Sequence, residues 1–188
     1  MQIVLLRHGK PKIRTDLWVS AAELGTWVAE YNAAGIDPEF PPPERAIEQV
    51  KSCPFVVCSS LPRSMDSALA LGIERVDACE SLFRELDLPY ASWRFPRLSL
   101  LAWAVLFRLM WALGYSANGE SISEGRERAM LCAERLAEMA AEHGRVVFVG
   151  HGALMWFVAR RLKEAGWSGP KKAPRRYWEF GVYSYERT

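Results

Sequence analysis

The first nine residues, MQIVLLRHG at positions 1–9, decide how the rest of the sequence is interpreted. An apolar run, IVLL, stops abruptly at Arg7, His8 and Gly9. An apolar run with such sharp ends is typical of a buried strand. In open α/β sheets, functional sites form where strands deliver side chains at their carboxyl ends. We therefore expect His8 to lie at the centre of a site.

The composition is that of a globular protein, with 50% hydrophobic and 24% charged residues among 188. This length predicts a single domain over residues 1–188. The net charge of +2 is too small to favour nucleic acid or an anionic membrane as a partner. The start of the chain has no signal-peptide pattern, which predicts a cytoplasmic location. The four cysteines lack CxxC spacing, which favours reduced thiols over a disulfide or metal set. The oligomeric state is not apparent from these features.

Strand-like and helix-like segments alternate along the chain. Besides the first strand, apolar runs predict strands at residues 55–58, 75–78 and 146–149, and an alternating tail predicts a late edge strand at 177–185. Apolar periodicity predicts helices at residues 20–35, 43–51, 64–71, 123–144 and 152–165. Ser20 and Glu23 form a capping-box pattern at the start of the first helix. This alternation predicts a three-layer α/β/α sandwich.

One stretch differs from ordinary core segments. Residues 98–113, LSLLAWAVLFRLMWAL, are almost wholly apolar and contain one charged residue, Arg108. A bilayer span needs about 20 apolar residues, so the stretch is too short to cross a membrane. We expect a largely buried helix or a lid. A helix that rests on a membrane surface is the alternative.

Three predicted strand ends carry side chains suited to one reaction. The first strand ends at Arg7 and His8, the second is followed by Arg63, and the clearest strand ends at His151. The chain has three histidines, and two of them lie at such ends. An imidazole flanked by cations is suited to accept a phosphoryl group, because fixed positive charges stabilise the charge spread over its oxygens.

The sequence resembles the histidine phosphatase superfamily, also called the phosphoglycerate mutase-like family. The resemblance rests on five motifs that occur in the family's order and span nearly the whole chain. They are LLRHG at 5–9, SSLPRSMDSA at 59–68, FRELDLP at 83–89, NGES at 118–121 and VVFVGHG at 146–152. It implies a mixed, mostly parallel central sheet with helices on both faces.

The resemblance also implies roles for individual residues. His8 is the expected nucleophile, which forms a phosphohistidine. Arg7, Arg63 and His151 are expected to bind the phosphoryl oxygens, since planar guanidinium groups suit such oxygens. His151 is also counted among the catalytic residues, because the bound phosphate dianion should raise its pKa and keep it cationic.

Glu85 is the expected general acid, which protonates the leaving oxygen and then helps to deprotonate the attacking water. Glu80 and Asp87 lie close by in the sequence and remain alternatives, and Glu85 has the further alternative of simply pairing with Arg84. Glu120 in the NGES motif is expected to support the start of a helix rather than to act as a catalyst.

Two glycines beside the expected site, Gly9 and Gly152, are expected to let the backbone approach the phosphate closely. Lys10, Lys12 and Arg14 follow the nucleophile and are candidate contacts for a second anionic group of the substrate. Neither a metal nor another cofactor is required, because arginines and histidines supply the positive charge.

The branch of the family is inferred from two departures. KPKI follows the RHG motif where the family's mutases carry a different polar signature, and the chain is shorter than those mutases. Both favour hydrolysis of a small phosphorylated metabolite over phosphoglycerate mutase-type transfer. Residues 93–118 are expected to form a hydrophobic lid. Such a lid favours a substrate with an apolar or aromatic leaving group, and it predicts that Trp103 and Phe107 affect substrate preference.

Two further functions remain open. One is a regulatory module that binds phosphate with little turnover, although such a module would usually lack one of the five expected residues. The other is a phosphatase acting on protein phosphohistidine, which an apolar lid disfavours because a protein substrate needs an open cleft.

Overall fold

The centre of the fold is a five-stranded sheet in the order β4-β3-β6-β1-β7. In the computed structural model, which describes residues 1–51 and 53–186, these strands are β1 (Gln2–Arg7), β3 (Phe55–Ser59), β4 (Ala78–Glu80), β6 (Arg145–Gly150) and β7 (Phe180–Ser184). The neighbours are parallel except β7, which pairs antiparallel with β1. The predicted mixed, mostly parallel sheet is confirmed.

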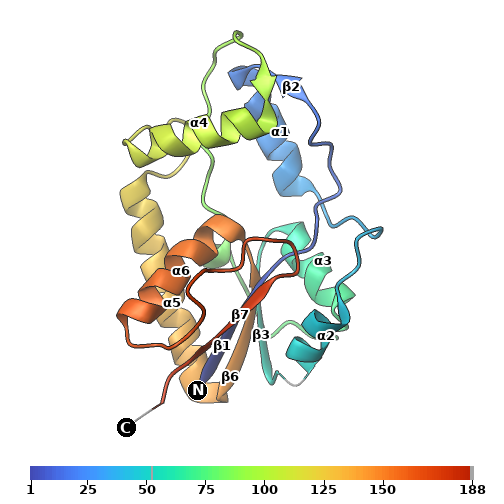
Figure 1. The fold of residues 1–188 in the computed structure, drawn as a ribbon, viewed down its shortest axis with the longest axis vertical. Coiled ribbons are helices and arrows are strands. Elements are labelled where there is room, and N and C mark those ends of the chain that lie inside the picture. Colours follow the sequence, from blue (N-terminus) through green and yellow to red (C-terminus); the bar gives the residue numbers. More distant parts are fainter. Residues whose placement is uncertain (52, 187–188) are drawn as a thin grey trace.

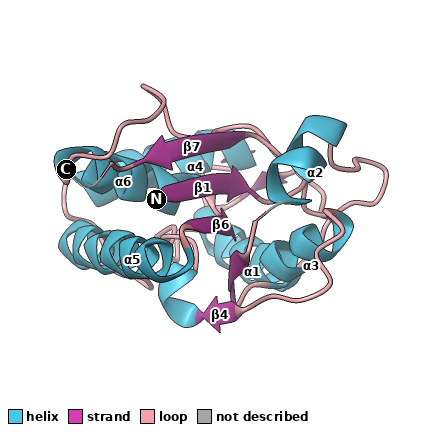
Figure 2. Ribbon diagram, turned by 90° about the horizontal axis from the view of Figure 1, so that it is seen from below, coloured by secondary structure: helices cyan, strands magenta, loops and turns pink. Residues whose placement is uncertain are grey.

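Helices cover both faces of this sheet (Figure 2). One face packs against α5 (Ile122–His143) and α6 (Gly152–Glu164), and the other against α2 (Glu44–Lys51) and α3 (Pro62–Ala70). Alternate residues of each strand point to opposite faces, so Ile3 and Leu5 join the first core while Val4 and Leu6 join the second. A strand that is buried on both faces needs a continuous apolar run, which is why IVLL was informative. The three-layer prediction is confirmed.

A third apolar cluster lies beyond the carboxyl ends of the parallel strands (Figure 1). It contains α1 (Ala21–Ala33), α4 (Leu100–Ala112) and the two-stranded pair β2 (Trp18–Val19) with β5 (Leu98–Ser99). Trp103 and Phe107 of α4 are buried against α1 and its flanking residues. This small unit therefore has its own core, and it faces the end of the sheet where a site is expected.

The prediction that the apolar stretch is largely buried is only half right. Trp103, Phe107 and their neighbours on one face of α4 are buried, but the opposite face exposes Leu101, Leu109 and Leu113. A helix that is apolar all round buries only the face that has a partner. No helix among residues 1–51 and 53–186 has the length and apolarity needed to cross a membrane.

The strand predicted at residues 75–78 is wrong in position, because β4 runs from Ala78 to Glu80. Asp77 explains the shift. Its carboxylate accepts a hydrogen bond from the Val56 amide at 2.9 Å, and its own amide donates to the Val56 carbonyl, so the chain is anchored there before strand pairing begins at Ala78. A 3-10 helix, η1 (Ser81–Phe83), follows directly. The Ser20–Glu23 capping box is confirmed.

Candidate active site

Three adjacent strands end side by side at one edge of the sheet. In the register of the sheet, Arg7 pairs with Gly150, and Cys58 pairs with Val149. Since β3, β6 and β1 are parallel neighbours, the residues that follow each strand are brought to the same edge. These residues include His8, Arg63 and His151, which the sequence predicted at the ends of separate strands.

His8 is buried, with 1% of its surface exposed, and its ring is oriented by the backbone. The ring Nδ1 lies 2.7 Å from the carbonyl oxygen of Gly9, which can only accept, so Nδ1 carries the proton and Nε2 keeps a lone pair. Burial lowers the pKa of His8 well below its ordinary value, and the nearby His151, Arg63 and Arg7 lower it further. At neutral pH the imidazole is therefore uncharged, as a nucleophile must be.

His151 lies 5.1 Å from His8 between ring centroids and immediately precedes α6. Its Nε2 is 2.6 Å from the hydroxyl oxygen of Ser59, the last residue of β3. Burial, followed by the charges of Arg63 and Arg7, lowers the pKa of His151 well below its ordinary value. The cationic form that we expect with bound phosphate remains a prediction.

Arg63 is fully buried near the start of α3. Its guanidinium donates to the carbonyl of Tyr31 at 3.0 Å and to the side-chain oxygen of Asn32 at 3.4 Å, and it lies 4.5 Å from the centroid of the Tyr31 ring. Burial lowers the pKa of Arg63 from its ordinary value. Residues of α1 thus fix the direction of this cation.

Arg7 is positioned from the other side by the segment that precedes β7. Its guanidinium donates to the carbonyl of Arg175 and lies 4.6 Å from the centroid of the Tyr177 ring. The Tyr177 ring is also 5.8 Å from the His8 ring. Tyr177 therefore covers the nucleophile and its neighbouring cation together.

Three buried nitrogen atoms at this site have no hydrogen-bond partner among the described residues. They are Nε of Arg7, Nε of Arg63 and Nδ1 of His151. A buried polar group without a partner costs free energy, and native proteins contain few of them. These atoms belong to the three residues expected to bind phosphoryl oxygens. An anion with several acceptor oxygens is the kind of ligand that supplies partners for such groups.

Glu85 lies beside the site, and its carboxylate is held at the N-terminus of α6. The carboxylate accepts from the amides of Ala153 at 3.2 Å and Leu154 at 2.9 Å. It also lines the same cavity as Arg7. Helix α6 thus begins at one expected catalytic residue, His151, and positions a second one through its free amides.

Two arginines fix the backbone that carries Glu85. Arg128 of α5 donates to the carbonyls of Leu82, Arg84 and Glu85, and Arg108 of α4 donates to those of Leu86 and Asp87. Glu120 accepts from Arg128 at 2.9 and 2.5 Å. Glu120 therefore supports the acid-bearing segment indirectly, whereas Ser121 and Glu124 form the capping box at the start of α5.

Gly9 has a packing reason that the sequence did not reveal, because a Cβ there would overlap the Trp178 ring. A Cβ at Gly152 would make an ordinary contact with the Arg7 guanidinium at 3.4 Å. The Gly9 amide also donates to the Ser67 hydroxyl at 2.8 Å, which fixes the turn after His8. Close approach to phosphate remains a prediction for both.

The three cations predicted to contact a second anionic group lie apart from the cavity that Arg7 and Glu85 line. Lys10 pairs with Asp37 at 3.5 Å, Arg14 pairs with the exposed Asp16 at 3.3 Å, and Lys12 is exposed. Their contribution to substrate binding stays a prediction.

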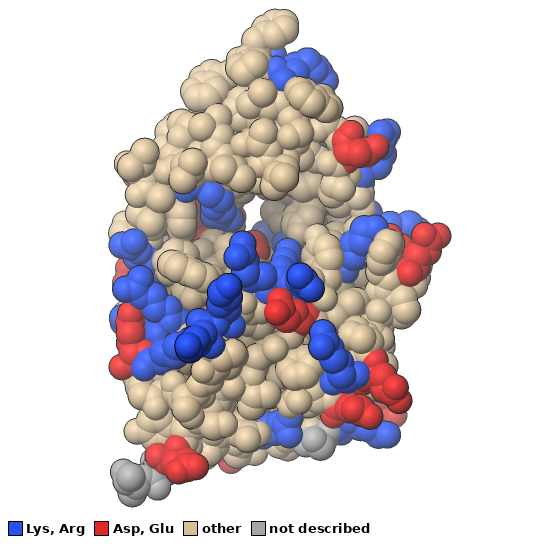
Figure 3. All heavy atoms as spheres, viewed as in Figure 1, with Lys and Arg blue, Asp and Glu red and all other residues tan. Residues whose placement is uncertain are grey.

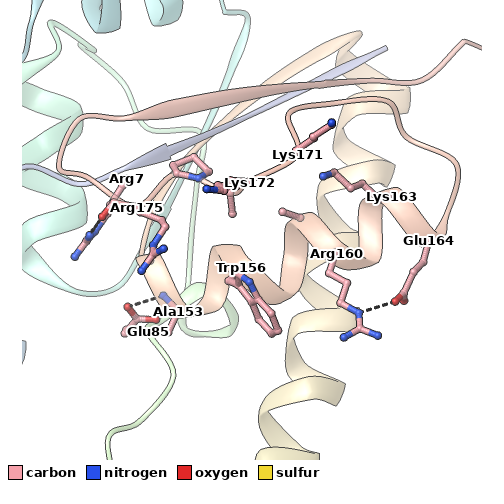
Figure 4. A pocket seen from close by; sticks show the side chains of 14 residues that line it. Arg7, Glu85, Ala153, Trp156, Arg160, Lys163, Glu164, Lys171, Lys172 and Arg175 are labelled. Atoms are coloured by element: carbon pink, nitrogen blue, oxygen red, sulfur yellow. Dashed lines mark hydrogen bonds and ion pairs between the residues drawn. The ribbon is translucent and has the colours of Figure 1, made fainter. Parts of the chain in front are cut away.

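A cavity of about 890 Å³ opens from the site along α6 (Figure 4). Its lining residues are Arg7, Glu85, Gly152, Ala153, Trp156, Ala159, Arg160, Lys163, Glu164, Lys171, Lys172, Ala173, Pro174 and Arg175. Basic side chains gather around a hollow in the middle of this face, below the apolar upper part of the molecule (Figure 3). No residue of α4 lines this cavity. Among the described residues, no group of three or more His, Cys, Asp or Glu side chains has the arrangement of a metal site.

Several residues of the site were not singled out from the sequence. Ser59, Ser67 and Tyr31 have contacts with site residues that lie far away in the sequence, and Tyr177 lies in the tail. Ser59 and Ser67 fall inside the SSLPRSMDSA motif, so that motif was the available signal. Tyr31 and Tyr177 had no local signal, because an aromatic residue beside a cation is recognised only in three dimensions.

Comparison with known proteins gives a family match. A model described as histidine phosphatase superfamily (branch 1) matches residues 44–187. The match includes Arg63, Glu85 and His151 and begins after His8, so His8 joins this set through the geometry of the site. No curated protein sequence matches the chain.

Solved structures with a similar fold cover most of the chain. The product of open reading frame Rv3214 of Mycobacterium tuberculosis aligns with a TM-score of 0.60 and 18% identity, covering 98% of this chain and 91% of that one. A mycobacterial glucosyl-3-phosphoglycerate phosphatase gives 0.55 and 20%, covering 87% and 79%. The ecdysone phosphate phosphatase of Bombix mori, in complex with tungstate, gives 0.55 and 15%, covering 100% and 92%. At these identities the likeness concerns the fold.

Proposed function

This chain belongs to the histidine phosphatase superfamily, branch 1, and from that premise we propose that it hydrolyses phosphomonoesters through a phosphohistidine on His8. The substrate is a small phosphorylated metabolite, and the expected cytoplasmic location belongs to the same proposal. Two of the similar structures are those of phosphatases, which fits this reaction class.

The observation that carries the proposal is the set of unpartnered buried nitrogens around His8. Arg7, Arg63 and His151 each leave one such nitrogen without a partner among the described residues. A transferring phosphoryl group offers three oxygens, and its charge is stabilised by donors that are already in place. The neutral Nε2 of the neighbouring His8 supplies the nucleophile.

In the first step, Nε2 of His8 attacks phosphorus, and the bond between phosphorus and the ester oxygen breaks. The leaving oxygen takes a proton from Glu85, and the product alcohol departs. The phosphoryl group is now bonded to Nε2, and Nδ1 keeps its proton on the Gly9 carbonyl. That hydrogen bond stabilises the positive charge that develops on the ring.

In the second step, water attacks phosphorus and gives a proton to Glu85, and the bond between phosphorus and Nε2 breaks. Inorganic phosphate leaves, and both His8 and Glu85 return to their starting states. Arginine and histidine side chains supply all of the charge stabilisation in this scheme, so it includes no metal or other cofactor.

The preference for an apolar leaving group needs a different structural basis from the one predicted. Trp103 and Phe107 are buried between α4 and α1, so they cannot form the inner surface of a lid. Trp156 is half exposed and lines the cavity beside Glu85. We therefore place the aromatic contact for the leaving group at Trp156.

The proposal is tested with p-nitrophenyl phosphate in the presence of EDTA, comparing wild type, His8→Ala and His143→Ala. His143, the third histidine, stacks on Phe55 at 4.0 Å and is a matched control. We expect turnover in wild type and in His143→Ala, and none in His8→Ala. Rapid quenching with a labelled phosphoester should mark His8 alone.

The same assays separate the alternatives. Phosphate binding without turnover by the wild type would replace the hydrolase with a phosphate-binding regulatory module. Transfer of the label to a phosphoglycerate acceptor faster than to water would indicate a mutase. Full activity of His8→Ala would refute the mechanism.

A further inference from the structure

The cavity beside the site carries an excess of positive charge that the proposed reaction does not use. Its lining contains six cations and two carboxylates. The Glu85 carboxylate is bound by α6 amides, and the Glu164 carboxylate is paired with Arg160 at 2.8 Å and Arg161 at 2.9 Å. Both carboxylates of the lining therefore already have partners, and neither pairs with a lysine of the cavity.

The three lysines of the lining have no acidic partner among the described residues. Within residues 1–51 and 53–186, no carboxylate lies within ion-pair distance of Lys163, Lys171 or Lys172. Lys163 comes from α6, and the other two come from the loop that follows it. In Figure 4 the side chains of Lys163, Lys171 and Lys172 lie on the same side of α6. Like charges that line one cavity without acidic partners repel one another, and an anion bound among them relieves that repulsion.

The cavity that carries this cationic end also reaches two residues of the candidate site, Arg7 and Glu85. The cavity begins at Arg7, Glu85 and Gly152, and it extends along α6 to Lys163. Eleven residues of helix separate Gly152 from Lys163, which corresponds to roughly 16 Å at 1.5 Å per residue. A molecule whose phosphoryl group reaches His8 would need a long leaving group to reach the lysines.

Trp156 lies between the two ends of the cavity. Its side chain is 51% exposed, and its ring packs edge-on against Phe157 at 4.7 Å between centroids. One face of a large apolar ring is thus available halfway along the cavity. A flat or apolar middle segment of a ligand would bury surface there.

We propose that the cavity binds the leaving group, and that this group carries a second anion, a phosphate or a carboxylate, which Lys163, Lys171 and Lys172 bind. The inference rests on the proposed hydrolase function and names its substrate class. The substrate is an elongated phosphomonoester with a flat or apolar middle segment over Trp156. Its two anionic groups are separated by roughly 10–15 Å, which is somewhat less than the helix span because lysine side chains reach inward.

The test uses monoesters of linear diols, from ethanediol to decanediol, in matched pairs. One member of each pair carries one phosphate, and the other carries a phosphate at both ends. Phosphates that end in a carboxylate form a third series and show which anion is preferred. We expect kcat/KM to rise with the second anion, most strongly for the longer chains, and to lose this gain at high salt.

Substitutions of the lysines test which residues cause the gain in kcat/KM from the second anion. We expect Lys163→Gln with Lys171→Gln to remove the advantage of the bisphosphates, by about tenfold for each lysine, because a charge-assisted hydrogen bond contributes about 1.5–3 kcal/mol and 1.4 kcal/mol is tenfold. Turnover of p-nitrophenyl phosphate should stay within about twofold of wild type, since its leaving group is too short to reach these lysines. Lys51→Gln, an exposed lysine of α2, is the matched control and should keep the full advantage.

Two results would overturn the inference. Either the second anion brings no gain at any chain length, or the gain persists in the double variant. In both cases p-nitrophenyl phosphate would still be hydrolysed through His8, so the proposed function would stand. Failure of the hydrolase would instead appear as no turnover of any monoester and no labelling of His8, and bisphosphate binding measured by calorimetry would then still report on the lysines.

Discussion

His151 and Ser59 stand at the carboxyl ends of adjacent strands and share a 2.6 Å hydrogen bond between the imidazole Nε2 and the hydroxyl oxygen. The Ser59 oxygen also accepts from the Leu61 amide at 3.3 Å. When the hydroxyl gives its proton to Nε2, the neutral ring carries its own proton on Nδ1, the atom that has no partner among the described residues. We therefore expect Ser59 to make His151 a donor for a phosphoryl oxygen.

Ser59→Ala should weaken inhibition by inorganic phosphate by about tenfold, because a hydrogen bond to a charged group contributes about 1.5–3 kcal/mol and the His151 proton is no longer directed. The exposed Ser123 at the start of α5 offers a matched control, Ser123→Ala, which should behave as wild type. Nitrogen chemical shifts of His151 report the tautomer directly. Unchanged shifts together with unchanged phosphate inhibition would show that Ser59 has no such role.

The stability of the protein should rise with pH below neutrality. The pKa values of His8 and His151 are lowered in the folded protein, so near and below pH 6.5 the unfolded chain binds protons that the folded one does not. The free energy of unfolding should then fall by about 1.4 kcal/mol per pH unit for each histidine as the pH drops from 6.5 toward the folded pKa.

The combination of His8→Asn with His151→Asn should flatten this dependence, and His143→Asn should not. Urea denaturation followed at several pH values measures the slope. An equally steep slope in the double variant would assign the acid sensitivity to other groups.

Arg128 should affect catalysis selectively, because it anchors the backbone that presents Glu85. Arg128→Met removes the donors to the carbonyls of Leu82, Arg84 and Glu85 and to the Glu120 carboxylate. We expect kcat to fall for alkyl phosphates, whose leaving oxygen needs a proton, and much less for p-nitrophenyl phosphate. Glu85→Gln should give the same pattern, with a loss of about a hundredfold or more on alkyl phosphates.

Arg135→Met is the matched control on the same helix, because Arg135 pairs with the surface acids Glu80 and Glu138. It should leave both substrates unaffected. Equal losses on alkyl and nitrophenyl phosphates in Arg128→Met would point to general instability rather than to a displaced acid.

Substitutions of two tryptophans should distinguish an effect on stability from an effect on substrate preference. Trp103 is buried, and its indole N–H donates to the Val19 carbonyl at 2.7 Å, so Trp103→Ala should lower the free energy of unfolding by about 3–5 kcal/mol. Trp156 is half exposed in the cavity, so Trp156→Ala should change stability little and reduce the preference for aryl over alkyl leaving groups. Thermal denaturation and paired kinetics measure both effects. A change in substrate preference in a still-folded Trp103→Ala would restore the lid hypothesis.

The layers of the fold were predictable because the strands are buried on both faces. Continuous apolar runs such as IVLL and VVFV predict the buried strands of a parallel sheet directly. Positions that depend on a single distant hydrogen bond were not predictable. Asp77 forms hydrogen bonds with Val56, and β4 therefore begins three residues later than predicted. The local sequence contains no pattern that predicts this contact.

The candidate site likewise has a part that the sequence predicted and a part that it did not. Arg7, His8, Arg63 and His151 could be placed because each follows a recognisable strand, and the structure brings these strand ends together. Their catalytic roles stay predictions. The basic cavity could not be foreseen, because α6 and the loop after it contribute its lysines separately. The cations that follow the nucleophile in the sequence, Lys10, Lys12 and Arg14, do not line this cavity.

The order of the strands also has a consequence for how the protein is made. β1 precedes the other strands of this sheet along the chain, and it pairs with β6 and β7, which follow all of the others. Its apolar residues must therefore wait for almost the whole chain before they are covered, which slows folding and favours binding by chaperones meanwhile. A nascent chain that ends before Tyr177 lacks both β7, the neighbour of the nucleophile's strand, and the tyrosine that covers the nucleophile. Termination before Tyr177 should consequently yield no partly active protein.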